Sequence, residues 1–148
     1  DDRGNVIDEW IGQDMVVWLQ VRPVSPNGPK NTAMLGPGGR WGRACQYPFV
    51  RPAAGEWNHF WHAYRVEPCK HVVRRMFEHH KATPSSPLRW LTTDMIDMPD
   101  YGGGVGYSLF DQNVAIAEWL RNLWNDVGAS DTGPAPGRER IGGRRTAP

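Results

Sequence analysis

Glycine and proline restrict this chain more than any other residue types. They number 17 and 13 among 148 residues and recur along most of its length. Proline removes a backbone N–H, and glycine loses more conformational freedom on folding than any other residue, so both shorten helices and strands. We therefore expect an α+β protein that is mostly helical, with long irregular Pro/Gly-rich segments between short elements.

Two segments differ in composition from the rest of the chain. Residues 22–43 hold four prolines and five glycines, and a structureless run of this length usually has a function or lies across a partner. Residues 129–148 contain almost nothing that can build a core, and such a composition does not fold alone. We predict a single small domain over residues 1–128 with an extended loop at 22–43. We also predict that residues 129–148 form an extended low-complexity tail, which crosses another polypeptide instead of packing on the domain.

The first half of the chain predicts one strand and a pair of helices. Residues 15–21 are rich in β-formers and almost continuously apolar, which predicts a strand buried on both faces. A second helix is expected over residues 69–81, after a Pro-containing joint that predicts a helical hairpin. The first helix of that pair begins near residue 56, where aromatic residues recur at the spacing of one helix face. They are Trp57, Phe60, Trp61 and Tyr64.

The second half predicts one longer helix. Residues 88–96 fit a strand or a helix equally well. The longer helix runs from residue 111 or 112 to 127, with Asp111 as its N-cap and Gly128 as its stop. The residues that we expect this helix to bury are Ile116, Leu120, Leu123 and Trp124.

Charge and hydropathy narrow the choice of partners. With 17 basic and 16 acidic residues the net charge is +1, too weak to draw the chain onto nucleic acid. No apolar run approaches the ~20 residues that a membrane helix needs, so we expect no transmembrane segment. Eight tryptophans favour interfaces, because the indole ring is apolar while its N–H needs a partner. We expect protein subunits as partners, and the residues predicted to contact them are Arg40, Trp41, Arg43, Arg138, Arg140, Arg144 and Arg145.

Histidine and cysteine residues concentrate in the middle of the chain and suggest an alternative function, zinc binding. Zinc takes Cys and His in groups of four, and a small zinc-dependent enzyme or binding module would use His59, His62, Cys69 and His71. The spacing matches no standard zinc site, so we expect no metal and no cofactor. Cys45 and Cys69 fit one disulfide or two free thiols equally well.

Two short patterns are typical of phosphate-binding or catalytic sites, but each lacks the rest of its site. The glycines of residues 102–106 are not followed by the Lys-Ser/Thr pair of a phosphate loop. The Asp-Thr-Gly at residues 131–133 lies among Ala, Ser and Pro in the tail, away from any apolar-flanked rigid loop. We therefore expect no catalytic site.

These features together predict a non-catalytic accessory or structural subunit that ties neighbouring subunits together in a large multi-protein assembly. The chain begins at Asp1 without Met, which fits either removal of a targeting segment or an engineered start. An organellar assembly, such as a mitochondrial respiratory-chain complex, is our first expectation, and secretion is left open.

Overall fold

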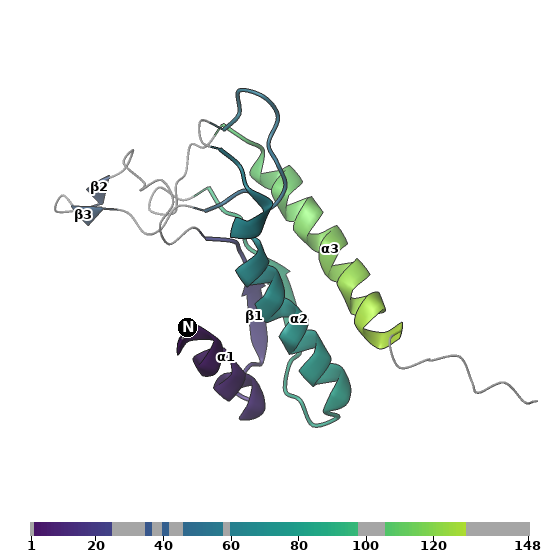
Figure 1. Ribbon diagram of the computed structural model, residues 1–148. Helices are drawn as coiled ribbons and strands as arrows, with labels where there is room; N and C mark the ends of the chain where they lie inside the picture. Colours follow the sequence, from purple (N-terminus) through teal and green to yellow (C-terminus); the bar gives the residue numbers. More distant parts are fainter. Residues whose placement is uncertain are drawn as a thin grey trace, which may run out of the picture.

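The computed structural model describes residues 2–24, 35–36, 40–41, 46–57, 60–97 and 106–129 (Figure 1). In chain order its elements are α1 (Asp2–Gly12), β1 (Trp18–Val21), β2 (Leu35–Gly36), β3 (Arg40–Trp41), the 3-10 turn η1 (Ala63–Arg65), α2 (Glu67–Ala82), β4 (Trp90–Thr93) and α3 (Leu109–Ala129). Helices outweigh strands, so the protein is helix-rich and mixes α and β structure, as the sequence predicted.

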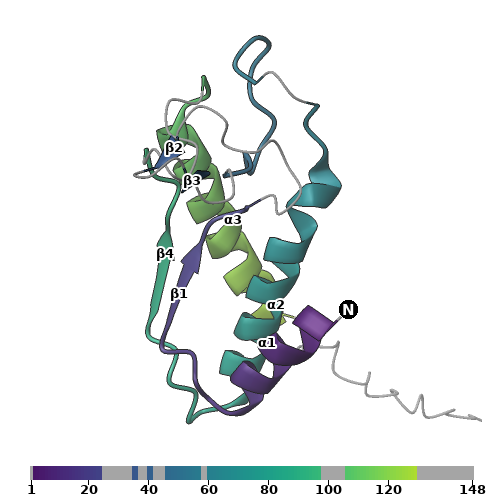
Figure 2. The same cartoon turned by 90° about the vertical axis from the view of Figure 1, so that its left-hand side faces the viewer.

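β1 and β4 form a two-stranded parallel sheet, in which Trp18 lies opposite Trp90 and Val21 opposite Thr93. Parallel neighbours need a crossover connection, and α2 is the helix of this crossover. α2 contacts both α1 and α3, and α3 also contacts β4. The two strands run along one side of the helices, with β1 between β4 and α1 (Figure 2). β4 also shows that residues 88–96 contain a strand and not a helix.

Two groups of buried side chains form the core of the described residues. The larger group spans β1, α2 and α3 and includes Val21, Phe77 and Ile116. The smaller group brings Ile11 of α1 against Met76 of α2. α1 is therefore joined to the rest of the described fold mainly through the smaller group.

α2 confirms the helix expected over residues 69–81 and begins two residues earlier. Pro68 fits in its first turn, because the N–H that proline lacks has no intrahelical acceptor at that position. Val73, Met76 and Phe77 are buried along one side, and charged residues occupy the other. Here the spacing of apolar residues in the sequence located the buried face correctly.

The helix expected to begin near residue 56 is wrong. Between residue 56 and the start of α2, helical structure in the described residues is limited to η1. The Trp61 indole N–H donates to the Pro48 carbonyl at 2.9 Å, and the backbone N–H of His62 donates to the Tyr47 hydroxyl at 2.7 Å. These bonds hold the segment as irregular backbone, and Phe60 is 89% exposed. The aromatic spacing therefore does not mark a buried helix face, and the described residues of this segment do not form the first helix of a hairpin.

The strand predicted over residues 15–21 is shorter than expected and buried on one face. β1 begins at Trp18, which is 56% exposed, and Gln20 on the same face is also exposed. Leu19 and Val21 point inward and pack in the core. The expectation of burial on both faces is wrong, because the described helices cover one face of the sheet only.

α3 occupies the place predicted for the C-terminal helix, but it starts and ends differently. Ser108 is its N-cap, since the Ser108 hydroxyl accepts from the Asp111 N–H at 3.1 Å; Asp111 lies in the first turn. The helix continues through Gly128 and ends at Ala129, so Gly128 is not its stop. Gly106 is needed just before the helix, because a Cβ there would lie 2.8 Å from the Glu56 carbonyl oxygen.

The apolar stripe of α3 is confirmed at three of its four predicted positions. Ile116, Leu120 and Leu123 are buried, whereas Trp124 is 39% exposed. The Trp124 ring lies at the edge of the core and meets the Phe77 ring edge to face, with their centroids 5.2 Å apart.

Three side-chain amides hold two stretches of irregular backbone in place, one at Val50 and one at residues 95–96. Each amide accepts from the N–H of one residue and donates to the carbonyl of the same residue, as a neighbouring strand would. All six hydrogen bonds measure between 2.7 and 3.2 Å. The three pairs are Gln46 with Ile96, Asn113 with Met95, and Gln112 with Val50.

The predicted loop at residues 22–43 includes two very short paired strands. β2 and β3 are antiparallel, with Leu35 opposite Trp41. The other residues of 25–45 and the tail after Ala129 lie outside the described residues. The predicted path of the tail across a partner therefore stays a prediction.

Candidate functional site

The outer face of the parallel sheet holds two tryptophans on neighbouring strands. Trp18 and Trp90 are register partners and are 56% and 67% exposed. The Trp18 indole N–H donates to the Thr92 hydroxyl at 3.0 Å, which fixes the Trp18 ring over β4. Leu19 and Leu91, the next residues along, pack on the core side. Parallel strands are normally covered on both faces, so this Trp18–Trp90 face is an uncovered apolar surface of the described fold.

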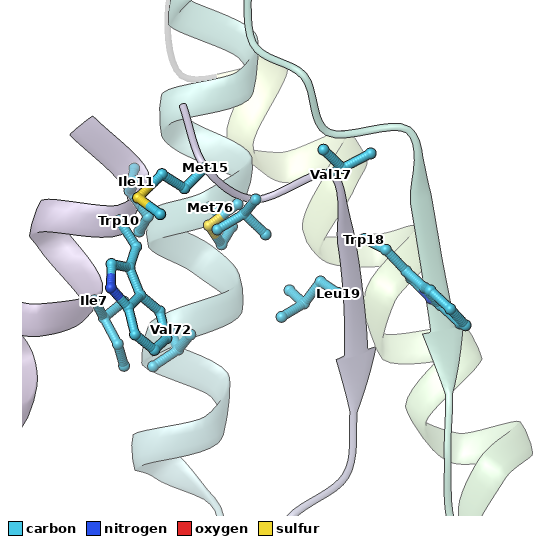
Figure 3. Close-up of a pocket in the computed structure, with 10 residues that line it drawn as sticks. Ile7, Trp10, Ile11, Met15, Val17, Trp18, Leu19, Val72 and Met76 are labelled. Atoms are coloured by element: carbon cyan, nitrogen blue, oxygen red, sulfur yellow. The ribbon is translucent and has the colours of Figure 1, made fainter. Parts of the chain in front are cut away.

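An apolar groove of about 540 Å³ opens between α1, β1 and α2. Figure 3 shows Ile7 and Trp10 of α1 on one side of the groove, with Leu19 of β1 on the other. No ionisable or nucleophilic side chain lines it, so the groove suits apolar groups and offers nothing for acid–base or nucleophilic chemistry. Its lining consists of Ile7, Trp10, Ile11, Met15, Val16, Val17, Trp18, Leu19, Val72 and Met76.

An ion pair and a hydrogen bond hold α1, and the turn that follows it, beside α2 along this groove. The Asp8 carboxylate lies 2.9 Å from the Arg75 guanidinium, and the Asp14 carboxylate lies 2.9 Å from His79 Nε2. Asp14 has a φ of 53°, a left-handed conformation that Asp tolerates better than most residues. Its N–H donates to the Ile11 carbonyl at 3.1 Å. This turn ends the helical segment and returns the chain toward β1.

The residues proposed for zinc do not converge where the structure describes them. His62 is exposed and lies between the rings of Phe60 and Tyr64, with centroid distances of 6.4 and 5.4 Å. His71 is exposed on α2, while Cys69 packs against the core. Among the described residues, no group of three or more His, Cys, Asp or Glu side chains could hold a metal ion. His59 lies outside them.

Cys69 is a free thiol whose surroundings disfavour the thiolate. Burial raises its pKa to about 11, and the nearby Lys70 ammonium lowers it only in part. A protonated thiol is a weak nucleophile and a weak metal ligand. Cys45 lies outside the described residues.

The side chains predicted to bind partners all lie outside the described part of the structure. Arg40 and Trp41 form β3, and their side chains lie outside the described part of the structure. Arg43 and the four tail arginines lie outside it altogether: Arg138, Arg140, Arg144 and Arg145. Their predicted role in binding stays a prediction.

Sequence reasoning missed the Trp18–Trp90 face and the groove. The signal that could have found the face is the alternation of two short segments, Trp-Leu-Gln-Val at 18–21 and Trp-Leu-Thr-Thr at 90–93. In both, the first and third residues share one strand face. The groove left no such signal, because its walls come from three separated segments.

No described helix is long and apolar enough to cross a membrane. Comparisons of the chain with models of protein families, with curated proteins and with solved structures find no match. A function for this protein must therefore be argued from the surfaces described above.

Proposed function

We propose that this chain is a non-catalytic accessory subunit that binds other protein subunits in a larger assembly. The observation that most supports the proposal is the exposure of Trp18 and Trp90 together on an uncovered parallel sheet. Tryptophan is enriched in the buried centres of protein interfaces, where its large ring loses contact with water. The Trp18 N–H already has the Thr92 hydroxyl as its partner, so a subunit could cover this ring without leaving the N–H unsatisfied.

The surroundings of the two tryptophans support the same function. Trp10, Met15 and Val17 are each at least half exposed and line the neighbouring groove. Single exposed apolar residues are common on any protein, but adjoining ones mark interaction sites. The near-neutral net charge of +1 agrees with a partner bound through apolar contact. A mitochondrial respiratory-chain complex stays the predicted host, on sequence grounds alone.

The proposal can be tested with the full-length tagged chain in the cells that naturally make it. We expect the chain in native extracts to migrate far above the mass of one copy and to purify with partners in fixed ratio. A double variant, Trp18→Ser with Trp90→Ser, should stay folded and lose those partners. Phe110→Ser is the matched control, because Phe110 is 76% exposed and belongs to α3, not to either strand of the sheet.

Two results would count against the proposal. A chain that migrates alone in every native extract has no subunit role. Retention of all partners by the folded double variant would show that the Trp18–Trp90 face is not the contact.

A further inference from the structure

The edge of β1 that faces α1 lacks a partner strand in the described part of the protein. The sheet there has two strands, and β4 pairs with the other edge. The carbonyls of Val17 and Val21 point toward β4, where they accept from the N–H groups of Arg89 and Asp94 at 2.9 and 3.2 Å. Backbone groups along a strand point alternately to its two edges, so those of Trp18 and Gln20 point toward the edge without a described partner.

The apolar groove lies directly beside this edge. β1 lies between β4 and α1 in two different views (Figures 2 and 3). α1 packs in the helix layer next to α2, but no described strand lies over it as β1 and β4 lie over the other helices. A third strand placed next to β1 would run along the groove and direct alternate side chains onto Ile7, Trp10 and Val72.

We infer that an extended segment of a partner polypeptide adds to β1 as a third strand and fills the groove. This inference rests on the proposed function, because it names the way in which a partner subunit binds. Strand addition obtains its affinity from main-chain hydrogen bonds and its specificity from pockets for alternate side chains, and this site offers both features. The groove has a volume of about 540 Å³, which is within the range of pockets that hold small ligands, about 300–1,000 Å³.

The lining sets the chemistry of the bound segment. β1 has four residues, so about four residues of the partner would pair with it. The side chains that point into the groove must be uncharged and apolar, because the lining has no charged group to compensate a buried charge. The residues between them face water on the outer side, next to Gln20, and are free to be polar.

The test uses the full-length chain, labelled with ¹⁵N, and a synthetic probe peptide. The probe has three valines alternating with threonines between terminal lysines, and its control is the same peptide with every internal peptide nitrogen methylated. We expect saturable shifts of backbone amide resonances in β1 and α1 with the probe and none with the methylated peptide. The methylated peptide keeps the side chains but has lost the donors of the ladder.

Gln20→Pro tests the edge itself. Proline removes the N–H that points away from β4, so the β1–β4 ladder is kept; proline is tolerated at such edge positions. We expect binding of the probe to weaken by about tenfold or more, with an unchanged circular dichroism spectrum. Gln20→Thr is the matched control, since it keeps the N–H and should bind like the native chain. If Gln20→Pro does not fold, Trp10→Ala gives a second test, because it removes one wall of the groove and should weaken binding similarly.

Three outcomes would overturn the inference. The first is no binding of the probe at millimolar concentration, and the second is equal binding by folded Gln20→Pro. The third is a dimer of the native chain in sedimentation that Gln20→Pro abolishes, which would make a second copy the occupant. A chain that purifies with partners, and keeps them in the folded Gln20→Pro variant, would leave the proposed function in place while the third strand fails.

Discussion

At the scale of single residues, three side-chain amides supply the hydrogen-bond partners that irregular backbone lacks because it belongs to no sheet or helix. Gln46 is fully buried, and its amide group satisfies both the N–H and the carbonyl of Ile96. A buried peptide group without a partner loses its hydration and gains nothing in return. These amides therefore let a chain rich in proline and glycine bury backbone that belongs to no sheet or helix.

Replacing Gln46 with Met tests this role. Methionine has a similar shape but offers no donor and only a weak acceptor, so the peptide groups of Ile96 lose their partner. We expect the free energy of unfolding to fall by about 2–4 kcal/mol, measured by urea denaturation. Gln13→Met is the control, because the exposed Gln13 bonds only to Glu9, and its change should stay within about 0.5 kcal/mol. Equal small losses in both variants would contradict the role assigned to Gln46.

The Cys69 thiol should be nearly inert at neutral pH. Burial raises its pKa from 9.0 to about 11, so alkylation by iodoacetamide at pH 8 should be roughly 100-fold slower than for an unperturbed thiol. The rate should increase as the pH approaches 11, and peptide mass spectrometry separates this site from Cys45. Alkylation of Cys69 at pH 8 as fast as that of a small free thiol would contradict the predicted inertness of this thiol.

The same shift in pKa fixes the sign of the contribution of Cys69 to stability. The unfolded thiol loses its proton near pH 9, whereas the folded one keeps it up to about 11. The contribution of the Cys69 thiol to the free energy of unfolding is therefore fully present below pH 9 and is lost as the pH rises through 11.

At the scale of elements, the positions of α2 and α3 are set by the spacing of their apolar residues, whereas the positions of the strands are set by the segments that pair with them. α2 and α3 lie where the periodicity of the sequence predicts them, because a helix makes its hydrogen bonds within one segment. β1 and β4 are 72 residues apart at Trp18 and Trp90 by sequence number. The pairing of β1 with β4 depends on how the chain folds back through α2, and no local sequence pattern predicts this pairing.

Leu120→Ala measures how much α3 contributes to the core. Leu120 is 9% exposed and packs in the larger buried group, so its truncation removes apolar contacts and leaves a cavity. We expect a loss of about 2–5 kcal/mol in the free energy of unfolding. Phe110→Ala on the same helix removes a side chain that is 76% exposed and should change stability by about 0.5 kcal/mol or less. A loss below about 1 kcal/mol for Leu120→Ala would show that α3 packs loosely.

At the scale of the whole molecule, the described fold is asymmetric. Helices α2 and α3 cover the inner face of the sheet, and the two strands leave Trp18 and Trp90 on the outer face. The groove beside β1 adds to that apolar surface. Both features include residues of β1, which is why we place the contact with a partner at β1 and not on the charged side of α2.

The sequence by itself determined the helix-rich α+β class, the position of α2, and the buried residues Ile116, Leu120 and Leu123 of α3. These follow from local spacing, since the side chains of one helix face recur every three or four residues. Only the tertiary structure decided that residues 56–57 and 60–62 are irregular, because the bonds of Trp61 and His62 to Pro48 and Tyr47 replace those of a helix. It also decided that Trp18 is exposed, because burial of a strand face depends on what packs against the sheet and not on the strand itself.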